Sequence, residues 1–175
     1  MRKKWLPLLP VLCFCSLILI SCGRPAENID VGCSTAELID AINAANESPD
    51  TTTNIHLSPG CVYEFSEIDN FDEMLFYVSG NALPVISTTV NIDGRSAAII
   101  RTAAADTPQF RFFHINRDGN LTINNVSMVG GNTIGNGGAI LNQGDLSVNN
   151  CELYNNSAEQ DGGAIQSEFS NRSFY

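Results

Sequence analysis

Lysine and tryptophan are nearly missing from this chain, and neither occurs beyond the first five residues. The lysines are Lys3 and Lys4, and the only tryptophan is Trp5. Beyond them, six arginines face nineteen acidic residues, which gives this part of the chain a net charge of −13. A surface this negative repels phosphate backbones, so the composition argues against nucleic acid as a partner.

The N-terminus has the pattern of a secretory signal peptide. Positive charges occupy residues 2–4, and an apolar run fills residues 5–20. This order of basic and apolar regions is typical of export signals. The run is too short, and too interrupted by Pro7 and Pro10, for a membrane-spanning helix. We therefore expect residues 1–21 to be removed.

A candidate lipidation site follows the apolar run directly. Leu19-Ile20-Ser21-Cys22 resembles the bacterial lipobox, in which the cysteine thiol accepts a diacylglycerol and becomes the first residue. The lipid chains would hold the protein on a membrane, since each buried CH₂ adds roughly 0.8 kcal/mol. The sequence thus predicts an exported, surface-exposed protein anchored to the cell membrane or outer membrane through Cys22. The alternative is an ordinary cleaved signal peptide in which Cys22 has no role.

Three cysteines remain beyond the lipidation site. In an oxidising compartment Cys33 and Cys61 are a plausible disulfide, and Cys151 is expected as a buried free thiol. A metal site combining cysteine with His56 or His114 has no supporting ligand spacing. We therefore expect no metal and no other cofactor.

A helix is predicted near the start of the exported chain, after a short tether over residues 22–30. Ser34-Thr35-Ala36-Glu37 forms a capping box, and apolar residues recur at helical spacing through residue 45. We expect a helix over 35–46, followed by strands at 54–58 and 61–65. Residues 31–65 would form an N-terminal cap, and residues 66–175 would form the repetitive part.

Further short strands are expected at 85–86, 89–92, 98–100 and 110–115, where apolar and polar residues alternate. Asp93-Gly94 and Asp118-Gly119 separate some of them. The less regular segment 66–81 is interpreted as a loop lying over the core.

An internal repeat of 25 residues is the most informative feature. Residues 121–128 (LTINNVSM) align without a gap with residues 146–153 (LSVNNCEL). The same shift places Gly137, Gly138, Ala139 and Ile140 on Gly162, Gly163, Ala164 and Ile165. Strands this short suit one coil of a β-helix in which successive units stack in parallel. Apolar side chains would then form inner columns, and the Asn pairs at 124–125 and 149–150 would form corners.

These motifs resemble those of right-handed parallel β-helix proteins of bacterial surfaces. That group includes the pectate-lyase-like superfamily and the polymorphic outer-membrane proteins, whose repeats carry Gly-Gly-Ala-Ile and a Phe-x-x-Asn tetrad. Here Leu153 stands in place of that phenylalanine. The resemblance implies an all-β, right-handed parallel β-helix with an N-terminal capping helix. Because such relatives continue for many coils, it also implies that the coils here are incomplete after the second Gly-Gly-Ala-Ile.

Two functions from different classes follow as expectations. The first is an adhesion, binding or structural module without catalysis, whose stacked polar face meets a polysaccharide or a protein; a rigid spacer fits the same pattern. The alternative is the N-terminal part of a polysaccharide lyase or glycoside hydrolase, which would use acids and bases from the coils. Those candidates are Asp93, Asp106, Asp118, Asp145, Asp161, Arg95, Arg101, Arg111 and Arg117. Each Asp lies in a turn or beside Gly, where backbone hydrogen bonding explains it, so the residues favour the first function and leave the enzyme as the alternative.

Overall fold

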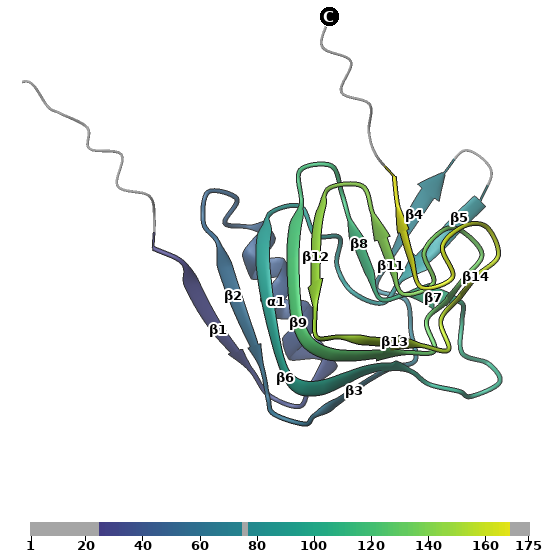
Figure 1. The fold of residues 1–175 in the computed structure, drawn as a ribbon, viewed down its shortest axis with the longest axis horizontal. Helices are drawn as coiled ribbons and strands as arrows, with labels where there is room; N and C mark the ends of the chain where they lie inside the picture. Colours follow the sequence, from purple (N-terminus) through teal and green to yellow (C-terminus); the bar gives the residue numbers. More distant parts are fainter. Residues whose placement is uncertain (1–24, 75–76, 169–175) are drawn as a thin grey trace, which may run out of the picture.

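The chain folds into a parallel β-solenoid of about five turns. The computed structural model describes residues 25–74 and 77–168, in which 49% of the structure is strand and one short helix occurs. Figure 1 shows the long strands lying side by side with the helix behind them. The predicted all-β parallel solenoid is therefore confirmed.

The five turns contribute different sets of strands, and the two longest strands, β6 and β9, belong to the third and fourth turns. The first turn contains β1 (Glu27–Val31) and α1 (Thr35–Asn46). The second contains β2 (Thr53–Leu57), β3 (Val62–Phe65), β4 (Asn70–Met74) and β5 (Tyr77–Asn81). The third contains β6 (Thr89–Arg101), β7 (Phe110–Arg111) and β8 (Phe113–Ile115). The fourth contains β9 (Asn120–Val129), β10 (Asn132–Thr133) and β11 (Ile140–Asn142). The fifth contains β12 (Asp145–Asn149), β13 (Glu152–Tyr154), β14 (Ser157–Ala158) and β15 (Ile165–Ser167).

The strands form three sheets that run along the solenoid. The largest follows the order β1-β2-β6-β9-β12, with β3 paired to β6 and β13 paired to β9. The others follow the orders β14-β10-β7-β5-β4 and β15-β11-β8. Because β6 and β9 pass around a corner, the largest sheet covers two sides of the solenoid (Figure 1).

The 25-residue repeat sets the stacking register. Leu121 pairs with Leu146, and Ile123 pairs with Val148. Ile140 pairs with Ile165 in the smallest sheet, so the two Gly-Gly-Ala-Ile segments lie one above the other. Each turn thus shields the apolar interior of its neighbour, as stacked repeats require.

Backbone hydrogen bonds connect the stacked glycine segments directly. The amide of Gly137 donates to Asp161, that of Gly138 to Gly162, and that of Ala139 to Ala164. Gly137 has φ of 66°, a left-handed conformation that costs glycine little. A Cβ on Gly138 would collide with the backbone carbonyl of Gly163. The segment therefore needs glycine because two backbones approach closely there.

The helix closes the N-terminal end of the core. Leu38, Ala41, Ile42 and Ala45 of α1 are buried. The Ser34 hydroxyl accepts from the Glu37 amide, as the predicted capping box requires. The Glu37 carboxylate instead accepts from the amide of Gly32, at 2.7 Å, so it stabilises the segment before the helix.

Several sequence predictions about individual elements are wrong. Residues 27–30 are not a tether, because they belong to β1 and pair with β2. The segment 66–81 is not a loop, since β4 and β5 form an antiparallel hairpin within it. The segments 89–92 and 98–100 are one strand, β6, whose register shifts between Asp93 and Ala97. Segment 85–86 supplies only a single bridge, from Ile86 to Ile115.

A fully buried arginine joins the hairpin to the body of the solenoid. Arg111 in β7 donates from Nη1 to Asn81 at 2.9 Å and from Nε to the carbonyl of Asn136 at 3.1 Å. Its guanidinium also lies 3.6 Å from a carboxylate oxygen of Asp72 in β4. The partners of this arginine come from the turns on either side of its own, so it fixes the hairpin against the fourth turn.

Candidate functional site

The outer surface of the largest sheet carries a face of polar side chains, here called the polar face. Alternation along the strands turns Ile55, Ile92 and Ile123 inward, so the residues between them point outward. The polar face consists of two columns, Asn28-Asn54-Asn91-Thr122-Ser147 and Asp30-His56-Asp93-Asn124-Asn149.

Amide ladders order much of this face. Asn54 donates to Asn28 at 3.0 Å, and Asn91 donates to Asn54 at 2.9 Å. In the neighbouring column Asn149 donates to Asn124 at 3.0 Å. Each donating amide uses one N–H on its neighbour and keeps the second for an external partner, and each amide oxygen keeps a lone pair for the same purpose. The face therefore presents regularly spaced donors and acceptors held in fixed orientations.

A charged cluster lies at one edge of the polar face. Arg95 lies 3.7 Å from Asp30 and 3.6 Å from Asp93, so its guanidinium bridges two acids. His56 Nδ1 lies 4.0 Å from Asp93, and Asn125 donates to the same carboxylate at 3.3 Å. The single guanidinium thus offsets part of the negative charge of the two carboxylates.

The corner of the solenoid explains why Arg95 reaches this cluster. Asp93 pairs with Asn124 and Ala97 pairs with Val126, so residues 94–96 occupy a corner that Asn125 alone occupies in the next turn. Arg95 and Ser96 have φ of 49° and 65°, and Asn125 and Asn150 have φ of 56° and 50°. The prediction that the Asn pairs lie at corners is confirmed, with the second Asn of each pair in the left-handed conformation. The extra residues of the third turn project Arg95 over the neighbouring strands.

The remaining catalytic candidates do not converge. Asp93 and Arg95 are together, but Asp106, Asp118, Asp145 and Asp161 are exposed at separate positions in turns or at strand ends. Arg117 is exposed, and Arg101 is held by the carbonyls of Thr107 and Pro108. Burial lowers the pKa of the Arg101 guanidinium. Arg111 is enclosed in the core and cannot reach a substrate.

The histidines and cysteines likewise occupy separate places. His114 Nε2 lies 3.2 Å from Gln143, far along the chain from His56.

Cys33 and Cys61 form a disulfide, with their Cα atoms 5.5 Å apart, beside the N-terminus of α1. Cys151 is half-buried in the last turn rather than buried as expected, because no described strand stacks above it. Cys22 lies outside the described residues. Among the described residues, no group of three or more His, Cys, Asp or Glu side chains could hold a metal ion.

Sequence reasoning missed a second outer face, which lies around the corner from the polar face. The outward residues of β3, β6, β9 and β13 form the columns Val62-Ala98-Ser127-Glu152 and Glu64-Ile100-Val129-Tyr154. Five of these eight residues are apolar or aromatic, and we call them the apolar strip: Val62, Ala98, Ile100, Val129 and Tyr154. Val62 is 56% exposed and Tyr154 is 49% exposed. The sequence signal for this second face is the unbroken apolar run at 97–100. Apolar and polar residues do not alternate there, because both faces of β6 are apolar.

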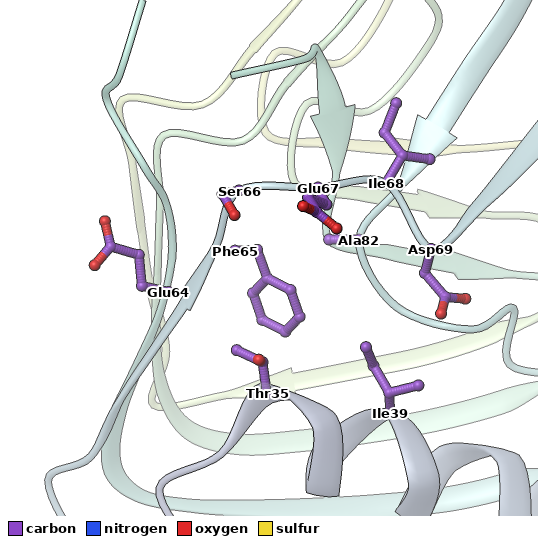
Figure 2. A pocket seen from close by; sticks show the side chains of 9 residues that line it. All are labelled: Thr35, Ile39, Glu64, Phe65, Ser66, Glu67, Ile68, Asp69 and Ala82. Atoms are coloured by element: carbon purple, nitrogen blue, oxygen red, sulfur yellow. The ribbon is translucent and has the colours of Figure 1, made fainter. Parts of the chain in front are cut away.

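A hollow of about 240 Å³ opens beyond the edge of β3, next to Glu64. Figure 2 shows Phe65 lying between Thr35 and Ile39 of the helix and the segment Ser66–Asp69. The apolar lining comes from Ile39, Phe65, Ile68 and Ala82. Three carboxylates, those of Glu64, Glu67 and Asp69, complete it. Its chemistry suits a group that combines an apolar stem with a positive end.

Comparison with protein-family models, with curated proteins and with solved structures finds no match for this chain. The class of protein is therefore assigned from the structure alone: it is a parallel β-solenoid closed at its N-terminal end by a helix. Within the described residues, no helix is both long and apolar enough to span a bilayer.

Proposed function

We propose that this protein is a cell-surface lipoprotein whose β-solenoid is a binding module for polysaccharide, using the polar face. The observation that carries the proposal is the pair of amide ladders, Asn28-Asn54-Asn91 and Asn124-Asn149. Fixed amides recur at about 4.8 Å from strand to strand. A chain of sugar hydroxyls could therefore bind several turns at once without ordering flexible side chains first.

The charges of the face favour an uncharged or cationic polysaccharide. Arg95 already pairs with both acids of the face, so no free cation remains on it to bind a uronate or sulfate. The acidic residues elsewhere on the surface also repel polyanions.

The test is a glycan array combined with substitutions that block the face from outside. Thr122→Arg and Ser147→Arg place long side chains in one column and leave the inner columns unchanged. We expect each to weaken binding at least tenfold, about 1.4 kcal/mol. Gln160→Arg makes the same charge change at an exposed turn and should leave binding unchanged. Absence of any glycan ligand, or an equal loss of binding in the Gln160 control, would refute the polysaccharide proposal. The rigid spacer would then be the remaining interpretation of the polar face.

A lyase or hydrolase is the second candidate, because Asp30, His56, Asp93 and Arg95 converge on the same face. An absorbance assay for unsaturated uronides, and a reducing-sugar assay, on acidic and neutral polysaccharides would detect it. Product formation that Asp93→Asn abolishes would replace the binding proposal with an enzyme.

The lipid anchor requires its own experiment. Metabolic labelling with a radioactive fatty acid should mark the protein, and Cys22→Ala should remove the label and release the protein from membranes. Label retained by the variant would exclude Cys22 as the anchor.

A further inference from the structure

The apolar strip needs a partner that neither the core nor the polar face supplies. Val62 and Tyr154 are exposed, and Ile100 and Val129 between them are half-buried. Contiguous apolar patches on an outer face mark interaction sites. The strip faces outward, since Tyr63, Ile99 and Met128 between its members are buried. It therefore contributes nothing to the interior of the solenoid.

Two carboxylates flank the strip. Glu64 lies at one corner of the eight-residue array, and Glu152 lies at the diagonally opposite corner. The hollow beside Glu64 adds Glu67 and Asp69. In the part of the chain that the structure describes, no arginine or histidine forms an ion pair with any of these four carboxylates. The matching surface on a partner must therefore be positive.

A second copy of this chain does not fit the strip. Two such faces related by a two-fold axis in their plane bring each glutamate opposite Val62 or Tyr154 of the other copy. That contact buries carboxylates without a partner, which costs several kcal/mol. The overall acidity of both copies opposes the contact further.

We propose that the apolar strip and the adjoining hollow are a docking surface for a basic segment of another protein. Apolar side chains of the segment would pack on Ile100, Val129 and Tyr154. Lysine or arginine side chains at its ends would pair with Glu64 and Glu152, which lie on strands separated by about 14 Å across the sheet. The hollow is large enough to take the stem of one such side chain over Ile39 and Phe65, with its charged end among the carboxylates.

The test uses three labelled synthetic peptides and the purified protein. The first alternates leucine with threonine and carries two lysines at each end; the second has glutamate for lysine, and the third has serine for leucine. Fluorescence anisotropy should show the first peptide binding about tenfold or more tightly than either of the others, because charge and apolar contact are both required. Equal binding of the first and third peptides would overturn the proposal, since it would reveal attraction by net charge alone.

Matched variants test whether the first peptide binds at the apolar strip. Glu64→Lys combined with Glu152→Lys should reverse the preference between the lysine and glutamate peptides. Asp118→Lys combined with Asp145→Lys makes an equal change in net charge elsewhere and should leave the preference unchanged. Tyr154→Ser should weaken binding, and Tyr154→Phe should restore it. Far-ultraviolet circular dichroism confirms that each variant is folded, and a reversed preference in the control pair would refute the assigned location.

Discussion

Arg111 illustrates how much a single residue contributes to this fold. Its side chain is among the largest that are fully buried. It joins the hairpin, through Asp72 and Asn81, to Thr133 and Asn136 of the fourth turn. A buried arginine with several partners is costly to interrupt, because removing it leaves the partners unpaired.

Arg111→Met should therefore lower the free energy of unfolding by about 3–5 kcal/mol. The loss arises because Asp72 keeps its charge without a counter-ion and Asn81 loses a donor. Urea denaturation measures the change. Arg117→Met, at an exposed position, should stay within about 0.5 kcal/mol. Equal midpoints for the Arg111 variant and the parent would contradict the role assigned to the buried pair.

Tyr63 gives the stability a dependence on alkaline pH. Burial raises the pKa of its phenol above the ordinary value of 10.0, the amide of Ser58 lowers it, and the charge of Glu37 raises it. The folded protein therefore holds the phenolic proton more tightly than the unfolded chain does. Stability from this group is complete below pH 10.0 and is lost as the pH rises through the folded pKa.

Tyr63→Phe tests this dependence. At neutral pH the variant should be about 1–2 kcal/mol less stable, because the hydroxyl no longer donates to Gly32 or accepts from Ser58. Above pH 10.0 its unfolding midpoint should fall less steeply than that of the parent. Urea denaturation from neutral pH to about pH 11 provides both values. Parallel curves for parent and variant would show that Tyr63 does not titrate in this way.

At the scale of elements, the sequence predicts what depends on short-range patterns. The helix at 35–46 was found because its cap and apolar stripe lie within a dozen residues. The stacking of 121–128 on 146–153 was found because the repeat is exact in length. The hairpin β4–β5 was missed because its place depends on Asp72 meeting Arg111, far along the chain. The apolar strip was missed because its residues come from four strands that only the stacking brings together.

The two glycine segments offer a matched comparison at this scale. In Gly138→Ala the new Cβ would collide with carbonyls of Gly163 and Ser157, so we expect a loss of about 1–3 kcal/mol or more. In Gly163→Ala the nearest atom is Asn156 O at 3.7 Å, so the loss should stay within about 1 kcal/mol. Thermal unfolding of both variants measures the difference. Equal losses of stability in the two variants would mean that the close approach of the two backbones does not exclude a side chain at Gly138.

Across the whole molecule, stability should decline toward the last described turn. Leu121, Ile123 and Met128 are fully buried, whereas Leu146, Val148 and Leu153 above them are only partly buried. In a stacked array each turn draws its stability from its neighbours. A turn covered on one side should therefore open more often than one covered on both.

Hydrogen exchange measured by mass spectrometry tests this gradient. Amides in residues 145–168 should exchange before those in residues 120–142, because local opening needs less free energy there. Leu121→Ala should also cost more than Leu146→Ala, since the two leucines occupy one inner column but differ in burial. Uniform exchange across the turns would indicate a single cooperative unit instead.

The corner of the solenoid has a consequence for how such a protein can change over generations. Residues 94–96 occupy in one turn the place that Asn125 alone fills in the next, yet the strands on either side stay in register. A turn with three residues at this bend therefore stacks in register on a turn with one. New side chains can therefore be added between the two outer faces without a change in the strands. Arg95, which pairs with Asp30, is an example.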